Sequence, residues 1–277
     1  MQIKEIIDYL DLLYPLSLQE DYDNAGHKVG DATQQLTGIL VTLDVTDDVI
    51  DEALASGFNL VVSHHPMIFA GLKSLVPTNT QTRMLNRLIK NDICVYSAHT
   101  NLDNLPGGVS FILGEKLGVR NLKTLKPMCP GKSKQQPVQT DANLVTAEQQ
   151  PGGGAIGELD TPLPYRDFVE RVKRVLQLPM IKCSTNPPSD VKCVALCGGS
   201  GSFLIDEAAR QHADIYLTSD IKYHDYQKAV GTIHLADIGH YESEQFAQEL
   251  IYNDIIKKFS NFACRITKAK TSYIQYI

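Results

Sequence analysis

Histidines and carboxylates concentrate in three short polar segments of this 277-residue chain. These segments read SHHP at 63–66, HTNLD at 99–103 and GHYESE at 239–244. Neutral imidazoles and carboxylates are ordinary protein ligands of divalent transition metals. The residue types in the three segments therefore point to a metal site, and to hydrolytic chemistry at that site.

The candidate metal ligands are three imidazoles and two carboxylates, namely His64, His65, Asp103, His240 and Glu244. This set exceeds the needs of one tetrahedral ion, whereas two ions bridged by a carboxylate and water would use it fully. If a helix begins near Tyr241, His240 and Glu244 lie one turn apart on the same face. Nitrogen and oxygen donors without thiolate suit Zn, Fe, Mn, Co or Ni and do not choose among them. We expect two divalent metal ions per chain.

The same residues also have structural interpretations. A histidine at the end of a strand can be a hydrogen-bonded structural residue. Glu244 can be a first-turn acid favoured by the helix dipole, and Asp103 can be a cap ahead of Pro106 and Gly107. The pattern alone leaves both interpretations open.

The elements that must position these residues follow an α/β pattern with largely parallel strands. SHHP directly follows the apolar run NLVV, and HTNLD follows the run ICVYSA. Ligands of open α/β sheets bind beyond the carboxyl ends of such strands. In the first half we predict strands at 38–43, 59–62 and 93–98, and helices at 47–56, 80–90 and 108–117.

The second half repeats this pattern after a polar segment rich in Gln and Pro, residues 126–151, which we interpret as a connector. We therefore expect a first α/β domain at 1–125 and a second at 152–277. In the second domain we predict a helix at 165–177, strands at 191–197, 214–219 and 232–238, and a long final helix reaching about Lys258.

The two halves also resemble each other. A shift of 155 positions aligns residues 49–65 with 204–220, with the same order of helix and strand in both. Ser219 and Asp220 then occupy the places of His64 and His65. This alignment predicts an internal duplication, with the metal site in the cleft between two similar domains.

Composition excludes several classes of protein. An apolar fraction of 43% and a charged fraction of 21% are ordinary for a globular chain, and the net charge of −6 gives no footprint for nucleic acid. The six cysteines form no CxxC pair and no disulfide framework, which favours a reducing compartment. The first helix candidate, 1–16, carries four charged side chains and is neither a signal peptide nor a membrane span. We expect a soluble, cytoplasmic protein.

Motifs along almost the whole chain resemble the family of GTP cyclohydrolase I type 2 homologues, also called NGG-interacting-factor-three-like proteins. DNAGHKVG is similar to the family's DNSGLQVG, LDVTDDVIDEA to its LDATEEVIEEA, and HTNLDNLPGGV to its HTNLDAAPGGV. In the second half GGSGS, SDIKYHD and DIGHYESE are similarly close. Separate matches in a fixed order make the resemblance specific.

The resemblance implies that the five residues named above are the ligands of a dinuclear centre. It also implies two similar α/β domains, a toroidal homohexamer whose metal sites face an internal cavity, and opening of the GTP imidazole ring with release of formate. The chain departs from the family at Tyr22, where Trp is usual, at His27, where Leu is usual, and at Ala155, where Arg is common. It also lacks the extra domain of longer members.

Our leading hypothesis is a dinuclear metal-dependent hydrolase with a small-molecule substrate, GTP or a related nucleotide. The alternative is a metal-binding or metal-delivering oligomeric scaffold without turnover. His99, Glu242 and His224 are candidates for proton transfer.

GGSGS at 198–202 is either a phosphate cradle or a tight turn between a strand and a helix. We expect His212 and His234 to be structural.

Overall fold

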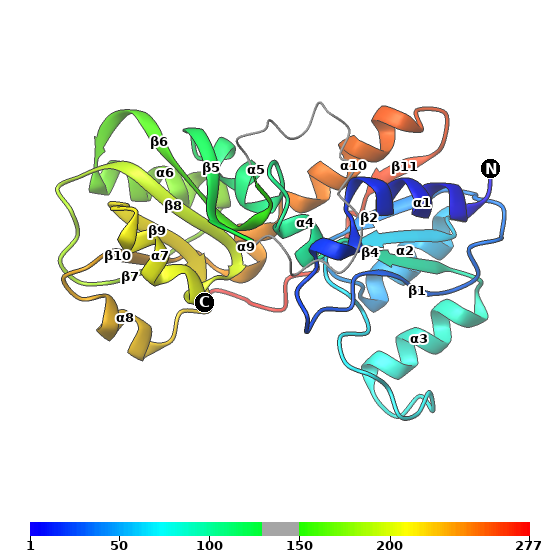
Figure 1. Cartoon of the computed structure of the whole chain (residues 1–277). Helices are drawn as coiled ribbons and strands as arrows, with labels where there is room; N and C mark the ends of the chain where they lie inside the picture. Colours follow the sequence, from blue (N-terminus) through cyan, green and yellow to red (C-terminus); the bar gives the residue numbers. More distant parts are fainter. Residues whose placement is uncertain (129–149) are drawn as a thin grey trace.

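The computed structural model describes residues 1–128 and 150–277 as two lobes, each built around one β-sheet (Figure 1). The blue end of the chain forms most of one lobe, and the green and yellow part forms the other. Two short helices, α4 (Thr100–Asp103) and α9 (His240–Glu244), lie where the lobes meet. The predicted α/β class is confirmed.

The first sheet has five strands in the order β1-β4-β3-β2-β11. Its three central strands run parallel, with Ile39 opposite Leu60 and Leu60 opposite Cys94. Every residue of these strands is buried, as expected for parallel strands covered on both faces. The first edge strand is antiparallel to its neighbour and the last is parallel. The bounds are β1 (Gly26–Val29), β2 (Ile39–Thr42), β3 (Leu60–Ser63), β4 (Cys94–Ser97) and β11 (Cys264–Ile266).

Helix α2 of this lobe begins and ends with capping residues that the sequence indicates. Thr46 accepts a hydrogen bond from the backbone N–H of Val49, and Gly57 ends that helix with a φ of 65°. Asn79 accepts in the same way from Thr82. The bounds are α1 (Ile3–Leu13), η1 (Leu16–Leu18), α2 (Asp47–Ser56), α3 (Thr80–Lys90) and α10 (Ala247–Lys258).

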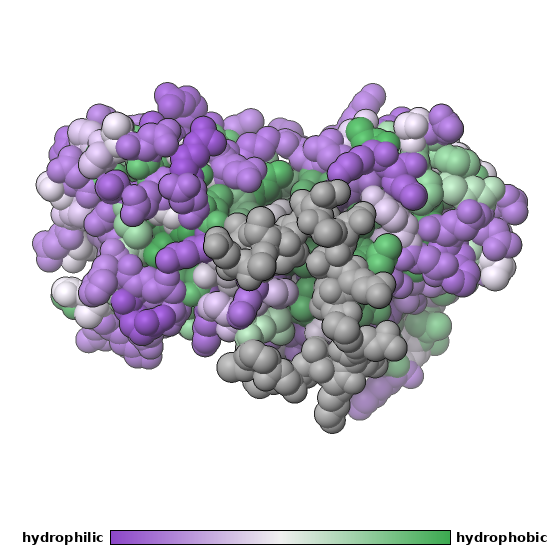
Figure 2. Space-filling view, turned by 45° about the horizontal axis from the view of Figure 1, so that its top comes forward, coloured by the Kyte–Doolittle hydropathy of each residue, from purple (hydrophilic) through white to green (hydrophobic). Residues whose placement is uncertain are grey.

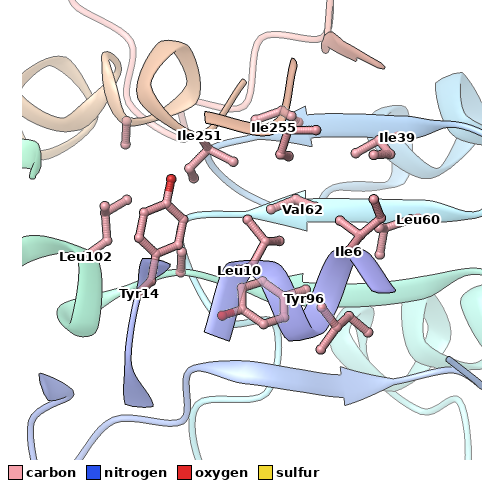
Figure 3. Close-up of a cluster of buried hydrophobic side chains, with 14 of the residues drawn as sticks. Ile6, Leu10, Tyr14, Ile39, Leu60, Val62, Tyr96, Leu102, Ile251 and Ile255 are labelled. Carbon is pink, nitrogen blue, oxygen red and sulfur yellow. The ribbon is translucent and has the colours of Figure 1, made fainter. Parts of the chain in front are cut away.

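Alternating strand residues serve two hydrophobic layers, one on each face of the first sheet. Leu60 and Val62 face α1 and α10, whereas Val61 faces α2 and α3. Figure 3 shows the first layer, in which Ile6 of α1 and Ile255 of α10 lie with the strand residues Leu60 and Val62. The C-terminal helix α10 is therefore part of the core of the first lobe.

The second sheet has six strands in the order β5-β6-β8-β9-β10-β7. Its strands β8, β9 and β10 run parallel, and the strands on either side of them are antiparallel. The bounds are β5 (Val119–Pro127), β6 (Gly152–Pro164), β7 (Lys182–Cys183), β8 (Asp190–Ser200), β9 (Ile215–Ser219) and β10 (His234–Asp237).

Helices cover both faces of the second sheet as well. One hydrophobic layer joins Phe111 and Phe168 to Leu217, and the other joins Ala208 and Tyr216. The first belongs to α5 and α6 and the second to η2, α7 and α8. The bounds are α5 (Val109–Lys116), α6 (Tyr165–Leu176), η2 (Ser202–Leu204), α7 (Ile205–Arg210) and α8 (Tyr223–Ala229).

Sheet membership departs from the expected division at 1–125 and 152–277. Strand β5 begins inside the first range but pairs with β6 in the second sheet, whereas β11 and α10 return to the first lobe. The predicted final helix is two helices, α9 and α10, because a turn at residues 245–246 interrupts the helical hydrogen bonding. Of the predicted connector, 126–127 end β5 and 129–149 lie outside the described residues.

Each lobe contains three parallel strands with a helix between successive strands, in the order β2-α2-β3-α3-β4 and β8-α7-β9-α8-β10. The segments aligned in the sequence, 49–65 and 204–220, are the first helix and second strand of each set. Internal duplication agrees with this order and stays a prediction.

Hydrophilic residues predominate over both lobes on the face shown in Figure 2. Within residues 1–128 and 150–277, none of the helices has the length and apolar character needed to cross a membrane.

Candidate metal centre

The three polar segments meet where the carboxyl ends of the parallel strands of both sheets come together. His64 and His65 follow β3. His99 and α4, which ends at Asp103, follow β4, and His240 opens α9 after β10. Residues separated by about 180 positions thus share one site, as the hydrogen-bond distance of 2.9 Å between His65 and Glu244 shows.

The adjacent histidines keep the hydrogen bonding of the strand that they follow. The N–H of His64 donates to the carbonyl of Thr42 at 3.1 Å, and the N–H of His65 donates to that of Leu43 at 2.9 Å. The two imidazole rings nevertheless lie with centroids 5.0 Å apart. A rigid continuation of the sheet therefore presents both rings to one site.

On α9, His240 and Glu244 lie one turn apart, as predicted, and His240 Nε2 is 3.1 Å from Glu244 Oε2. The backbone of β8 approaches this helix closely. A Cβ atom on Gly199 would lie 2.1 Å from Glu244 Oε1, and φ is +64° at this glycine. Only glycine leaves room for the carboxylate there.

The five predicted ligands form two groups that share Glu244. His64, Asp103 and Glu244 have ligand atoms within 4.8 Å of one another, and so do His65, His240 and Glu244. His64 Nε2 lies 3.8 Å from Oε1 of the shared carboxylate, while His65 Nε2 lies 2.9 Å from Oε2. A third group of the same size joins His64, His65 and His99.

Two buried atoms at the centre have no hydrogen-bond partner in the structure. They are Nε2 of His64 and Oδ1 of Asp103, which lie 3.6 Å apart. Buried polar atoms are nearly always satisfied, so an unpartnered nitrogen and oxygen facing each other fit a bound cation. Histidine and carboxylate clusters that could hold a metal are therefore present, and their donors are nitrogen and oxygen.

The other ring nitrogen of each histidine is held by a neighbour. His64 Nδ1 is 2.7 Å from the carbonyl oxygen of Ala98, His65 Nδ1 is 2.8 Å from Asp44, and His240 Nδ1 is 2.6 Å from Asp220. Such contacts fix the orientation of the ring and leave Nε2 directed at the site.

Sequence reasoning missed these supporting carboxylates. Asp44 follows β2 and Asp220 follows β9, so both stand at strand ends, and Asp220 occupies the place of His65 in the internal alignment. Their position at strand ends was the available signal.

Burial and mutual contacts set the charges of the cluster. Burial lowers the pKa of His64, which favours the neutral ligand form. Burial opposes protonation of His65 and His240 too, but contacts with carboxylates outweigh it and raise their pKa values to about 10 and about 9. For His65 these carboxylates are Asp44 and Glu244.

The two predicted carboxylate ligands shift in opposite directions. Burial, reinforced by the charge of Glu244, raises the pKa of Asp103 well above its ordinary value. Burial also acts on Glu244, but its three imidazole neighbours outweigh it and hold the pKa of Glu244 well below the ordinary value. The shared carboxylate is therefore the more acidic of the two candidate carboxylate ligands.

A cavity of about 400 Å³ opens onto the cluster. His65, Asp103, His240 and Glu244 lie on its wall, whereas the side chain of His64 is fully buried. A cavity of this size accommodates a small molecule beside the candidate ligands.

Of the three residues predicted to transfer protons, only His99 lines the cavity. Its Nδ1 is 2.7 Å from Oδ1 of Asp23, whose side chain is buried. Contacts with His99 and Thr100 outweigh burial and lower the pKa of Asp23 to about 2. Asp23 is a further carboxylate that sequence reasoning missed.

The other two candidates lie elsewhere. His224 is exposed on α8, with Nδ1 3.2 Å from Oε1 of Gln227, because the helix turns that side chain to solvent. Glu242 is buried beside Tyr276 and Gly239. It lies on a different face of α9 from His240 and Glu244, which point toward the cavity. Neither residue lines the cavity.

The glycines of GGSGS serve close packing. The N–H of Gly198 donates to Ser110 Oγ at 3.2 Å, and the N–H of Gly199 donates to Ser243 Oγ at 2.9 Å. These two groups already have partners within the protein, which favours the interpretation as a tight turn over the phosphate cradle.

The two histidines expected to be structural lie outside the cluster. His234 is buried, with Ser184 Oγ and Tyr165 OH each 3.0 Å from its ring nitrogens. His212 follows α7 with a φ of 57°.

Comparisons with known proteins agree with the fold and the motifs. The family model described as Duf34/NIF3 (NGG1p interacting factor 3) matches residues 1–273. A protein of Clostridium perfringens named GTP cyclohydrolase 1 type 2 homolog is 33% identical over 247 residues, covering 88% of this chain and 87% of that protein. A Staphylococcus aureus protein of the same name is 25% identical over 368 positions, covering both chains completely.

Solved structures show the same architecture. The crystal structure of Staphylococcus aureus protein SA1388 superimposes with a TM-score of 0.86 at 30% identity, covering 100% of this chain and 99% of that one. A Bacillus cereus protein related to NIF3 has a TM-score of 0.86 at 24% identity, with the same coverage, and supports the fold alone.

Proposed function

Because this chain belongs to the Duf34/NIF3 family, we propose that it is a dinuclear metal-dependent hydrolase acting on GTP or a related nucleotide. The name of its relatives, GTP cyclohydrolase 1 type 2 homolog, suggests the substrate and opening of a ring as the reaction. The observation that carries the proposal is Glu244, which is shared by two groups of candidate ligands.

The geometry of Glu244 supports two metal positions. Its Oε1 atom is the one that lies near His64, and its Oε2 atom is within 3.1 Å of both His65 and His240. One carboxylate with an oxygen directed at each group is the arrangement by which a bridging ligand holds two ions. His64 and Asp103 would complete the first position, and His65 and His240 the second.

Bound there, two divalent ions would lower the pKa of a water and polarise the group under attack. The protein supplies the remaining functions. Asp44 and Asp220 orient the imidazoles of His65 and His240. Asp23 holds His99 by Nδ1, which leaves Nε2 to accept or deliver a proton at the cavity wall.

The cavity favours the hydrolase over a metal-storing or metal-delivering scaffold. Four of the five candidate ligands line its wall, so a small molecule has access to them. A purely structural metal site is normally closed by its ligands. The family resemblance further supports a toroidal homohexamer, which sedimentation velocity of the metal-loaded protein would test.

The test measures metal content and turnover together. Wild-type protein supplied with Zn, Mn and Fe should hold about two ions per chain by elemental analysis. Glu244→Gln should lose both ions and Asp103→Asn should lose mainly one. The control Glu249→Gln, whose side chain is partly exposed and pairs with Lys116, should retain both. The proposal fails if the wild-type protein binds no stoichiometric metal.

Turnover is measured as release of formate and appearance of a ring-opened product from GTP and other nucleotides. His99→Gln should keep its ions and react roughly a hundredfold more slowly, because it removes the proton carrier and leaves the ligands intact. Metal-loaded protein with two ions and no turnover of any nucleotide would support the scaffold instead.

A further inference from the structure

Three aromatic side chains on the cavity wall stay exposed to solvent. Tyr22, Phe69 and Phe203 expose 62%, 50% and 61% of their surface, and all three line the cavity beside the candidate metal ligands. Large apolar side chains left uncovered around a concave site mark a surface for ligand binding.

These aromatic residues come from both lobes. Tyr22 precedes Asp23, and Phe69 follows the loop of His65, so both belong to the first lobe. Their ring centroids lie 6.2 Å apart with the planes at 43°. Phe203 lies in η2 of the second lobe, where its ring packs near Gly153. The cavity thus has aromatic faces on the walls contributed by each lobe.

Outside the histidine cluster, the charged side chains that the described residues place on the wall are unfavourable to a phosphate group. Apart from the histidine cluster, the charged side chains that line it are the carboxylates Glu20, Asp103 and Glu244, and no lysine or arginine of the described residues lines it. The backbone N–H groups of Gly198 and Gly199 already donate to serine hydroxyls. Away from the histidine cluster, a phosphate would therefore find neither a lysine or arginine of the described residues nor these two N–H groups on the wall.

We propose that the cavity binds a planar aromatic heterocycle by stacking, and that any phosphate attached to that ring stays outside. This inference rests on the proposed function and names its substrate class. A ring that enters first reaches the candidate metal ligands, where a ring-opening hydrolysis must act. Stacking of the heterocycle on the aromatic side chains then supplies the affinity, because every base has a π-face that stacks on Tyr or Phe.

The test compares ligands that share a ring and differ in phosphate. Equilibrium dialysis of the Zn-loaded, full-length protein against guanosine, GMP and GTP should give dissociation constants within about threefold of one another, since phosphates outside the cavity add little. Ribose 5-phosphate, which has the phosphate and no base, should not compete. Affinity that rises tenfold or more with each added phosphate, or displacement by ribose 5-phosphate, would overturn the inference.

Variants of Phe203 separate stacking from apolar bulk. Phe203→Leu should weaken guanosine binding roughly tenfold, and Phe203→Tyr, which keeps the ring, should bind like the wild type. Tyr223→Leu is the matched control, because Tyr223 is 80% exposed on α8 and lies outside the cavity. Equal binding by the Leu and Tyr variants of Phe203 would contradict the proposal.

Metal analysis and turnover, measured on the same samples, keep this inference distinct from the proposed function. Binding of guanosine that depends on Phe203 in a protein without stoichiometric metal would support the aromatic site and sink the hydrolase. A protein that holds two ions and hydrolyses a substrate without a ring, but binds no guanosine, would support the hydrolase and contradict the aromatic site.

Discussion

At the scale of single residues, the centre depends on carboxylates that do not face the cavity. Asp44 and Asp220 accept hydrogen bonds from the Nδ1 atoms of His65 and His240. This arrangement selects one tautomer for each ring and makes Nε2 a better donor to a cation. The two imidazoles closest to Glu244 are thus the two held by a carboxylate.

We predict that Asp220→Asn lowers the affinity for the second ion by roughly 10- to 100-fold. The amide keeps the shape of the side chain but loses the charge that holds the His240 ring. Competition with a metal-binding dye would measure the loss, with Asp225→Asn on exposed α8 as the control. Unchanged affinity would show that His240 needs no support from Asp220.

Metal affinity should rise with pH. In the metal-free protein the pKa values of His65 and His240 are about 10 and about 9, so both imidazoles are in the cationic, doubly protonated form at neutral pH. A cation must displace these protons, and each displaced proton raises the apparent affinity roughly tenfold per pH unit below the pKa. Titrations of Zn between pH 6 and pH 8 would measure the slope. A flat profile would contradict the protonated state of the free cluster.

At the scale of elements, the contact between β8 and α9 sets the position of the shared carboxylate. Gly199 N–H donates to Ser243 Oγ, and the absence of a side chain at Gly199 leaves space for Glu244. The strand of the second sheet therefore fixes the helix that carries two of the candidate ligands.

Gly199→Ala should remove metal binding. The new methyl group would lie 2.1 Å from Glu244 Oε1, so the carboxylate must leave its position between the two groups. Gly231→Ala is the matched control, since it also has a positive φ, 77°, but open space around the Cβ position. Both variants should lose about 1 kcal/mol of stability from backbone strain, and elemental analysis should show metal loss in the first alone. Metal retained by both variants would count against the placement of Glu244.

At the scale of the whole molecule, the candidate site joins the two lobes. His64, His65 and Asp103 come from the first lobe, whereas His240 and Glu244 follow the last parallel strand of the second sheet. The chain then returns through α10 and β11 to the first lobe. A cation held by ligands from both lobes would link the two lobes directly. The backbone already passes from one lobe to the other more than once.

Removal of the metal should therefore lower the melting temperature. A ligand present at a hundred times its dissociation constant stabilises the folded state by about 2.7 kcal/mol, which corresponds to roughly 5–10 °C for a chain of this size. Differential scanning calorimetry with and without chelator would measure the shift, with Glu244→Gln as the variant that chelator should not affect. An equal effect of chelator on that variant would place the stabilising ion elsewhere.

A division of the chain at residue 125 should not give two independent folding units. Fragment 1–125 lacks α10, whose Ile251 and Ile255 are fully buried in the core of the first lobe, and it separates β5 from its partner β6. We expect this fragment to lack a cooperative unfolding transition and to bind no metal. Circular dichroism and elemental analysis would test both points, and a folded fragment with two ions would refute them.

The sequence by itself determined the local elements and the chemical type of the site. Capping by Thr46 and termination at Gly57 depend on neighbouring residues, so α2 could be placed from the pattern. The spacing of His240 and Glu244 likewise fixed their common helical face. Ligand types at strand ends were enough to indicate a centre with nitrogen and oxygen donors.

Only the tertiary structure decided which strands share a sheet and which carboxylate is shared. Pairing of β5 with β6 and of β11 with β2 depends on contacts between distant segments, and a short strand has no pattern that names its partner. The same holds for Asp23, Asp44 and Asp220, because a supporting carboxylate is recognised by its distance to an imidazole. Glu244 became the shared residue because the packing of α9 on β8 places it beside His64 and His65, which are distant from it in the sequence.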